Sequence, residues 1–261
     1  MTSSPQMRGN LSEASRLLTE AREEGAALAV LPENFAYMGA EDADRLAVAE
    51  SWGEGPIQDF LHREALEKRL WLVGGTVPIR GEGGKVRSAS LLFDPQGRCA
   101  ARYDKIHLFD VGIPGSVESY QESATTVAGS EAVTADTPLG RIGMAVCYDI
   151  RFPALFQRLT DLGMDILVLP AAFTVPTGEA HWSVLARARA IEALCYVVAA
   201  GQWGEHSGGR QTYGHSMIVD PWGRVLAKRA AGAGVVMSDL DIIGLERLRE
   251  DFPALQHRHQ L

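Results

Sequence analysis

Cysteine is scarce in this sequence, and the cysteines do not have a spacing that is typical of a metal site. Cys99, Cys147 and Cys195 lie far apart without a CxxC pair, and the seven histidines include no HExxH arrangement. A disulfide framework or a zinc knuckle needs closely spaced cysteines, so neither is indicated. We therefore expect a protein of a reducing compartment that needs no metal.

Long apolar runs and an excess of positive charge are lacking as well. No stretch approaches the roughly 18 consecutive apolar residues of a membrane-spanning helix, and no basic stretch followed by an apolar one stands at the N-terminus. The formal net charge is -8 at pH 7, whereas a surface that binds nucleic acid needs an excess of Lys and Arg. We therefore expect a cytoplasmic protein that contacts neither membrane nor nucleic acid. The glycine patterns of phosphate-binding loops are also absent.

The residues that are present predict a layered α/β fold. Of the 261 residues, 46% are hydrophobic and 22% are charged, which is ordinary for a globular chain with a sizeable core. Short runs rich in Val, Ile and Leu alternate with amphipathic stretches, as expected when strands are covered by helices. We predict helices at 11–24 and 153–162, followed by buried strands at 27–31 and 165–169. No long linker interrupts the chain, which favours a single domain over residues 1–261.

Two pairs of similar segments indicate an internal repeat. VLPENF at 30–35 matches VLPAAF at 168–173, and SLLFDPQGRCAA at 90–101 matches SMIVDPWGRVLA at 216–227. The second pair has the pattern of a strand, a turn and a strand. We therefore expect two pseudo-symmetric halves whose sheets pack face to face with helices outside, in a four-layer αββα sandwich.

Cys147 is the candidate nucleophile. It follows a predicted strand at 142–146 and precedes a helix that begins near Phe152 or Pro153. A thiol at such a junction faces the partial positive charge of the helix N-terminus, which lowers its pKa and favours the thiolate. The alternative is a small apolar core residue, because free cysteines are often buried. Cys99, in a predicted hairpin strand, and Cys195, in an apolar run, keep that interpretation.

Glu33 and Lys105 are the candidate polar partners of such a nucleophile. Glu33 follows a buried strand and a proline, so its carboxylate is presented at the carboxyl end of the strand, where open sheets place their sites. The second copy of the repeat has Ala171 at this position, which invites a functional explanation for the acid. The alternative for Glu33 is a solvated loop residue. Lys105 lies in a predicted strand, and its alternative is a lysine that reaches from a sheet edge to the surface.

Three motifs in this order carry a resemblance to a known family. LPENF, YDKIHLF and VCYDIRFP resemble the Glu, Lys and Cys motifs of the nitrilase, or carbon-nitrogen hydrolase, superfamily. The stretches PAAFTVPTGEAHW, YGHSMIVDPWG and FPALQHR are most similar to the Nit branch, particularly to its amidases that act on deaminated glutathione. The resemblance implies an αββα sandwich, a homodimer or a larger homo-oligomer, and no metal or organic cofactor.

The resemblance also implies an amidase mechanism. Glu33 would take the proton of Cys147, whose thiolate attacks the amide carbon, while Lys105 and the backbone N–H of Tyr148 stabilise the oxyanion. The implied small-molecule substrate is deaminated glutathione, cleaved to 2-oxoglutarate and cysteinylglycine. The alternatives are an ω-amidase acting on 2-oxoglutaramate and, in another class, an inactive Nit-like binding module. A further alternative is a redox-active thiol protein. It is not favoured, because this sequence lacks the resolving cysteine that such chemistry usually needs.

Further site residues follow from the same resemblance. Glu122 matches the second carboxylate of the family, with Glu118 as the alternative position and a solvent-facing loop residue as the alternative interpretation. Arg151 would bind a substrate carboxylate through its planar fork, or else pair with a neighbouring acid. The remaining residues implied to line the pocket are Phe173, Thr177 and His181, and for His181 a structural histidine is the alternative.

Two loops and the chain start complete the expectations. The segment 81–84, GEGG, is predicted to be a hairpin tip, and 203–211 is predicted to be a mobile loop over a pocket. Relatives begin with a short apolar strand that leads into a segment like QMTSSP, whereas this sequence starts at MTSSP. We therefore expect the first strand of the family to be missing before residue 1.

Overall fold

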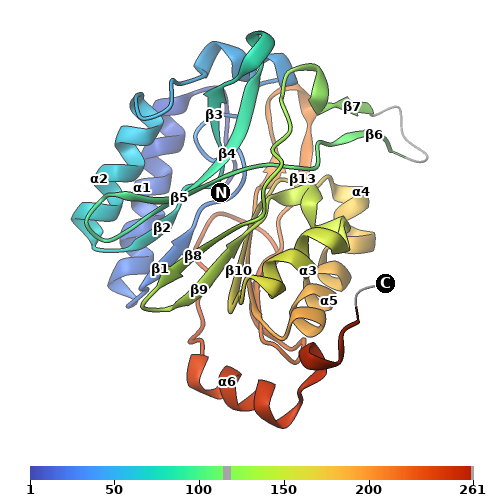
Figure 1. Ribbon diagram of the computed structural model, residues 1–261. Coiled ribbons are helices and arrows are strands. Elements are labelled where there is room, and N and C mark those ends of the chain that lie inside the picture. Colours follow the sequence, from blue (N-terminus) through green and yellow to red (C-terminus); the bar gives the residue numbers. More distant parts are fainter. Residues whose placement is uncertain (114–118, 260–261) are drawn as a thin grey trace.

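The computed structural model describes residues 1–113 and 119–259, and its first half forms a sheet covered on one face by two helices (Figure 1). The strands run in the order β1-β2-β4, and β3 and β5 also pair with β4. In chain order the elements are α1 (Met7–Glu23), β1 (Leu28–Val30), a short helical turn (Asp42–Val48), α2 (Pro56–Lys68), β2 (Trp71–Val73), β3 (Val77–Arg80), β4 (Val86–Phe93) and β5 (Cys99–Asp104).

The second half forms a six-stranded sheet in the order β15-β14-β11-β10-β9-β8, with α3 and α5 on its outer face. Its elements are β8 (Val133–Thr137), β9 (Gly140–Met144), α3 (Pro153–Asp161), β10 (Ile166–Ala171), α4 (Val175–Thr177), α5 (Ser183–Ala193), β11 (Tyr196–Gly201), β14 (Ser216–Val219), β15 (Val225–Arg229) and α6 (Ile242–Asp251). Two small hairpins stand apart, one made of β6 (Asp110–Gly112) and β7 (Ser119–Gln121), the other of β12 (Trp203–Glu205) and β13 (Gln211–Tyr213).

The internal repeat is present in the fold, because β1, β2, β4 and β5 occupy the same order as β10, β11, β14 and β15. The two turns agree in detail. Asp94 Oδ1 accepts hydrogen bonds from the backbone N–H groups two and four residues later, at 2.9 Å each, and Asp220 Oδ1 does the same at 2.9 and 2.8 Å. Gly97 and Gly223 follow in the left-handed region, with φ of 78° and 81°, where a glycine has no Cβ to clash.

The two sheets face each other across a shared core, and the helices lie outside (Figure 1). Leu28 and Val30 of the first sheet pack against the buried cluster that includes Ile166, Leu167 and Val168 of the second sheet. A second buried cluster lies beneath the helices of the first half, with Leu18, Phe35, Phe60, Leu61 and Leu72 among its members. The architecture is therefore the four-layer αββα sandwich of two pseudo-symmetric halves.

Several predicted boundaries are wrong. β10 continues through Pro170, because its neighbour β9 pairs with it only as far as Val168, so that no N–H is required of Pro170 on that side. The segment expected to be a loop at 203–211 begins with β12 and ends at the first residue of β13, so only 206–210 form the connection between these strands. The segment 81–84 does form the expected hairpin tip between β3 and β4. Lys105 follows the last residue of β5 instead of lying within the strand.

β1 lies at the edge of the first sheet and, among the described residues, pairs only with β2. A cavity of about 880 Å³ adjoins this edge, and Met1, Leu28, Val30 and Met217 are among its lining residues. The expectation that the first strand of the family is missing before residue 1 stays a prediction, as does that of a single domain. None of the helices in the described part of the chain is long and apolar enough to cross a membrane.

Candidate active site

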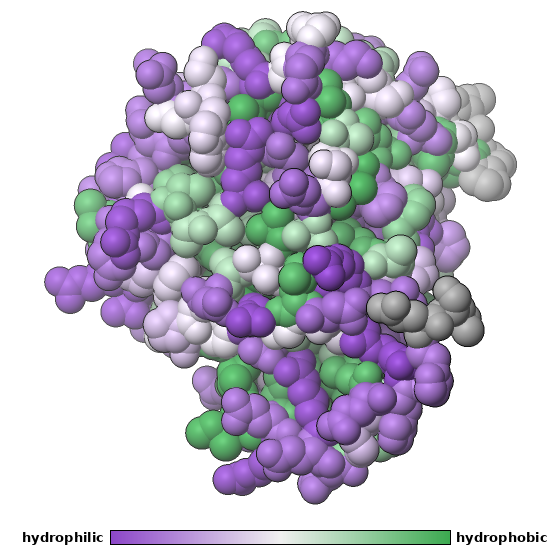
Figure 2. All heavy atoms as spheres, viewed as in Figure 1, coloured by the Kyte–Doolittle hydropathy of each residue, from purple (hydrophilic) through white to green (hydrophobic). Residues whose placement is uncertain are grey.

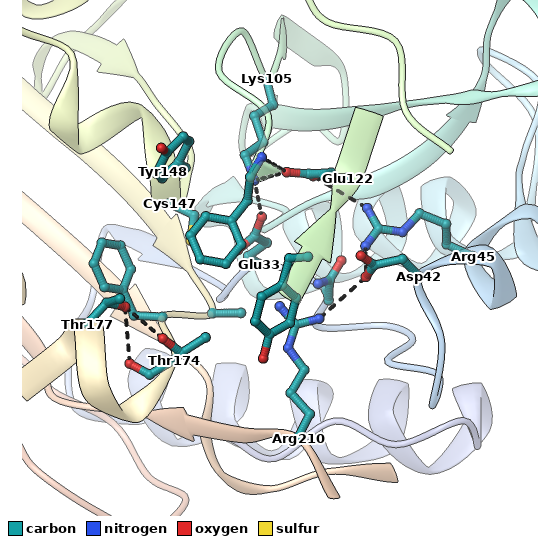
Figure 3. A pocket seen from close by; sticks show the side chains of 15 residues that line it. Glu33, Asp42, Arg45, Lys105, Glu122, Cys147, Tyr148, Thr174, Thr177 and Arg210 are labelled. Carbon is teal, nitrogen blue, oxygen red and sulfur yellow. Dashed lines mark hydrogen bonds and ion pairs between the residues drawn. The ribbon is translucent and has the colours of Figure 1, made fainter. Parts of the chain in front are cut away.

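A pocket opens where loops of both halves meet, and it collects side chains from distant parts of the sequence (Figure 3). Glu33 comes from the loop after β1, Lys105 from the residue after β5, and Cys147 from the turn after β9. Glu122 follows β7. The structure thus brings together the four residues for which a catalytic role was predicted.

Cys147 begins a tight turn, Cys147–Arg151, which separates β9 from α3. Its φ is 49°, in the left-handed region, where a residue other than glycine is strained by about 1 kcal/mol or more. The side chain is buried, with 7% of the residue exposed. The strand-to-helix junction and the start of α3 at Pro153 agree with the prediction, but the intervening turn was not predicted.

One buried carboxylate holds this turn against the segment that carries Lys105. Asp149 Oδ2 accepts hydrogen bonds from the backbone N–H of Val146 at 2.9 Å and from the Tyr103 hydroxyl at 2.7 Å. Its Oδ1 accepts from the backbone N–H of His107 at 3.0 Å and lies 2.7 Å from His107 Nδ1. Asp149 is completely buried. Sequence reasoning missed this residue, although an acid inside the apolar VCYDI stretch was a usable signal.

Lys105 is buried between two carboxylates. Its Nζ donates to Glu33 Oε1 at 2.9 Å and to Glu122 Oε2 at 2.8 Å, and only 2% of the residue is exposed. Burial alone would lower the pKa of Lys105, but the charges of Glu122 and Glu33 raise it overall. Lys105 therefore stays protonated, and its interpretation as a lysine reaching for the surface is wrong.

Glu33 is held from behind by the second half of the chain. It is 5% exposed, so the interpretation as a solvated loop residue is wrong. Gln202 Nε2 donates to the Glu33 carbonyl at 3.0 Å and to the Ser3 hydroxyl. The next residue, Asn34, has a φ of 57°, and its N–H donates to the Thr76 hydroxyl at 2.9 Å. Gln202 was not foreseen, because nothing local in its segment points to Glu33.

Glu122 is equally buried, at 5% exposure, which rules out the solvent-facing interpretation. Besides Lys105, its Oε2 accepts the backbone N–H of Phe109 at 2.8 Å, and its Oε1 lies 3.4 Å from Arg45 Nη1. Burial opposes ionisation, but Lys105 and Arg45 outweigh it and lower the pKa of Glu122. Glu118, the alternative second carboxylate, lies outside the described residues.

The electrostatics of Cys147 differ from the expectation. Burial raises the pKa of its thiol, and the charge of the nearby Glu33 raises it further. Lys105 and the backbone N–H of Ala172 act in the opposite direction without reversing the shift. The expected thiolate is therefore wrong, because desolvation of the thiol outweighs the charge of Lys105. The pocket presents a neutral thiol beside a carboxylate.

The described residues contain no group of three or more His, Cys, Asp or Glu side chains that could hold a metal ion. The predicted catalytic residues bring together in the pocket a thiol, two carboxylates and an ammonium group. A carboxylate beside a thiol can take its proton, and a cation beside the sulfur can stabilise an oxyanion.

Comparison with known proteins assigns the chain to a family. The sequence profile of the carbon-nitrogen hydrolase family matches residues 1–250. The chain belongs to this family. It is 42% identical to the deaminated glutathione amidase of Synechocystis sp., over 99% of this chain and 95% of that protein. The human deaminated glutathione amidase is 41% identical, over 99% of this chain and 80% of that protein.

Solved structures of the nitrilase superfamily have the same fold as this carbon-nitrogen hydrolase. The Caenorhabditis elegans NitFhit protein superposes with a TM-score of 0.91 at 37% identity, and the match covers 99% of this chain but 63% of the longer one. Saccharomyces cerevisiae Nit3, a member of branch 10 of the nitrilase superfamily, gives a TM-score of 0.88 at 30% identity, over 99% of this chain and 93% of that chain. The chain is thus a hydrolase of the amidase type.

The remaining expected residues of this carbon-nitrogen hydrolase divide into two groups. Tyr148, Phe173 and Thr177 line the pocket. Arg151 and His181 are not among its described lining residues. They contact each other, with Arg151 Nη1 lying 3.1 Å from His181 Nδ1, and the guanidinium lies 5.7 and 5.3 Å from the rings of Tyr148 and Phe173. In the described part of the chain Arg151 forms no ion pair with a carboxylate, so that alternative is wrong.

Two further cationic side chains of the pocket, Arg45 and Arg210, were not foreseen. Arg45, from the short turn Asp42–Val48, donates to Asp42 Oδ1 at 2.8 Å. Arg210, from the hairpin of β12 and β13, lies 3.5 Å from the same oxygen. Both line the pocket. The sequence contains a weak signal for Arg210, which stands in a segment expected to cover a pocket, but none for Arg45.

Proposed function

We propose that this carbon-nitrogen hydrolase is a cysteine-dependent amidase in which Cys147 forms a thioester with the acyl part of the substrate. One observation carries the proposal. A buried thiol lies beside Glu33, whose carboxylate is bound 2.9 Å away by a lysine that stays protonated. A neutral thiol with an adjacent base suits a nucleophile that is activated only when the substrate is present.

In the first step the Cys147 sulfur attacks the amide carbon while Glu33 takes the thiol proton. The carbonyl oxygen becomes an oxyanion, which Lys105 and the backbone N–H of Tyr148 stabilise. Such preorganised donors contribute about 3 to 4 kcal/mol each in well-studied hydrolases. The C–N bond then breaks as Glu33 returns the proton to the leaving amine, and a thioester remains.

In the second step Glu33 takes a proton from water, whose oxygen attacks the thioester carbon. The C–S bond breaks, the acid is released, and the proton returns to the Cys147 sulfur. Glu122 acts on Lys105 and not on the substrate. By binding the ammonium at 2.8 Å it keeps Lys105 charged and limits the directions in which Nζ points. Glu122 is therefore a positioning residue.

For the substrate we propose deaminated glutathione, whose hydrolysis yields 2-oxoglutarate and cysteinylglycine. The relatives that carry this name, at 42% and 41% identity over 99% of the chain, support the proposal. The second candidate is 2-oxoglutaramate, which has the same acyl part but releases ammonia. The ratio of kcat/KM for the two amides decides between them, because it measures differential binding of the two transition states. A preference for 2-oxoglutaramate would be consistent with the amidase proposal but would exclude deaminated glutathione as the preferred substrate.

Mass spectrometry of the intact protein tests the covalent step. Mixing with deaminated glutathione and quenching in acid should show a protein whose mass is increased by the 2-oxoglutaryl group. Cys147→Ala should lack this adduct, and Cys99→Ala, with its exposed side chain outside the pocket, should keep it. An adduct that survives in Cys147→Ala would contradict the assignment. A wild-type protein that binds the amide without adduct or turnover would instead be the inactive binding module.

A further inference from the structure

The charged groups of the pocket are unevenly paired. Its lining contains three cationic side chains, Lys105, Arg45 and Arg210, and three carboxylates, Glu33, Asp42 and Glu122. Lys105 binds two carboxylates at 2.8 and 2.9 Å. Arg45 binds Asp42 at 2.8 Å and approaches Glu122 at 3.4 Å. Among the carboxylates of the described residues, Arg210 contacts only Asp42, at 3.5 Å from an oxygen that Arg45 already binds more closely.

The guanidinium of Arg210 retains donors for another acceptor. Its Nε is buried and has no hydrogen-bond partner among the described residues. The guanidinium carbon lies over the Tyr120 ring, 5.0 Å from its centroid, and this contact uses the charge of the group and not its N–H donors. The side chain is 20% exposed, so a ligand in the pocket can reach it. A fork of N–H donors held in this way matches a carboxylate.

The backbone that carries Arg210 is firmly attached. The Arg210 carbonyl accepts the N–H of His206 at 2.8 Å. The His206 ring in turn lies 2.8 Å from the Ser3 carbonyl and 2.7 Å from the Thr212 hydroxyl. Thr212 also bridges to Thr174, which lines the pocket. These contacts of His206 and Thr212 therefore fix the position of Arg210 at the pocket (Figure 3).

We propose that Arg210 binds a carboxylate of the substrate and so makes this amidase selective for anionic amides. The inference rests on the proposed function, since the amide must reach Cys147. Deaminated glutathione carries one carboxylate at its oxo-acid end and another at its glycine end, whereas 2-oxoglutaramate carries only the first. Arg45, fixed by Asp42, contributes positive charge nearby. The sequence pointed to Arg151 for this role, but Arg151 lies outside the described lining and contacts His181.

Steady-state kinetics of Arg210→Gln and Arg210→Lys test the proposal on deaminated glutathione, 2-oxoglutaramate and the neutral amide propionamide. Loss of a charge-assisted bidentate contact should lower kcat/KM by about 10- to 100-fold on an anionic amide, and by less than about threefold on propionamide. Arg210→Lys should fall between the wild type and Arg210→Gln. A loss on both anionic amides places the oxo-acid carboxylate at Arg210, and a loss on deaminated glutathione alone places the glycine carboxylate there. Arg98→Gln, whose side chain is 76% exposed in the turn after β4, is the matched control.

Equal losses on all three amides, or no loss on any, would overturn the role of Arg210. A binding measurement separates this result from failure of the proposed function. Calorimetry with deaminated glutathione should give a Kd that is about 10-fold or more higher for Cys147→Ala with Arg210→Gln than for Cys147→Ala alone. That comparison needs no turnover, so it holds even when the wild type proves inactive. An unchanged Kd, or no binding to either protein, would refute the proposal.

Discussion

Cys147 shows at the scale of a single residue why the pocket needs a base. Burial in the core and the nearby Glu33 carboxylate raise the pKa of its thiol above the ordinary range. A raised pKa means that the neutral thiol predominates below it, so little thiolate exists near neutral pH. Attack on an amide then requires that the proton be removed during the step. Glu33, whose carboxylate lies beside the thiol, is placed to remove it.

The first prediction follows for Glu33→Gln. Turnover should fall by about 10² to 10⁴-fold, because a general base is lost. The pKa of Cys147 should at the same time decrease, because the negative charge that disfavours the thiolate is gone while Lys105 remains. Thiolate absorbance at 240 nm, followed during a pH titration against Cys147→Ala as the blank, measures this pKa. A midpoint that stays or rises in Glu33→Gln would contradict the assigned electrostatics.

A second prediction concerns Asp149, which accepts from four groups and is completely buried. Asp149→Asn keeps the shape but turns one acceptor into a donor facing other donors. We expect a loss of about 2 to 4 kcal/mol in the free energy of unfolding. Urea denaturation measures this loss, and Asp136→Asn, whose side chain is 80% exposed, should cost far less. Equal stabilities of the two variants would show that Asp149 does not hold the turn.

The helical segment after β10 positions one wall of the pocket at the scale of an element. α4 and α5 are joined by the wider π-helical turn Gly178–Trp182, a geometry that is frequent at functional sites. Gly178 lies under the Tyr213 ring, and a Cβ at Gly178 would stand 2.3 Å from the Tyr213 Cγ. The absence of a side chain therefore lets the hairpin that carries Arg210 pack against the segment that carries Thr177.

The third prediction is that Gly178→Ala separates these two elements. The clash should cost about 1 to 3 kcal/mol of stability and lower kcat/KM, because Thr177 and Arg210 both move relative to Cys147. Gly9→Ala in α1 is the control. There the nearest atom to a new Cβ is 4.0 Å away, and alanine in a helix is neutral or stabilising by up to about 1 kcal/mol. Thermal unfolding and kinetics of both variants decide, and similar behaviour of the two would refute the packing argument.

At the scale of the whole molecule, polar and apolar surfaces are unevenly distributed. In the view of Figure 2, hydrophilic atoms cover most of the rim, and hydrophobic atoms are exposed in the middle of the face and near the α6 segment at the bottom. A further apolar surface comprises Ile191, Trp222 and Phe252, which are 49%, 53% and 48% exposed, and Ile191 lies beside Gly223, the residue after Trp222. The rings of Trp222 and Phe252 are in contact, with centroids 5.5 Å apart.

The fourth prediction is that this patch joins two copies of the chain, because exposed apolar surface of this kind is typical of interfaces. Sedimentation velocity should show a homodimer or a larger homo-oligomer for the wild type. Ile191→Glu should shift the distribution towards the monomer, since a charge would be buried in the contact. Leu66→Glu, at 46% exposure on α2, is the control for a charge placed elsewhere. A distribution that is the same in all three proteins would exclude the patch as the interface.

Patterns that depend on near neighbours could be predicted from the sequence. The turns at Asp94 and Asp220 are closed by groups within four residues, so the repeated DP and GR letters were sufficient to predict both. The two halves and the αββα layers followed from that repeat. The boundaries were less accurate, as at Pro170, because the need for a backbone N–H depends on which strand lies alongside.

The sequence by itself determined the family, the fold class and which acid, lysine and cysteine to examine, because these are properties of short motifs and their order. Only the tertiary structure decided that the ammonium of Lys105 joins Glu33 to Glu122, and that Arg45 and Arg210 face the same pocket. It also reversed the expected pKa shift of Cys147. The physical reason is that desolvation and Coulomb interactions depend on distances through space, and these are set when segments more than a hundred residues apart pack together.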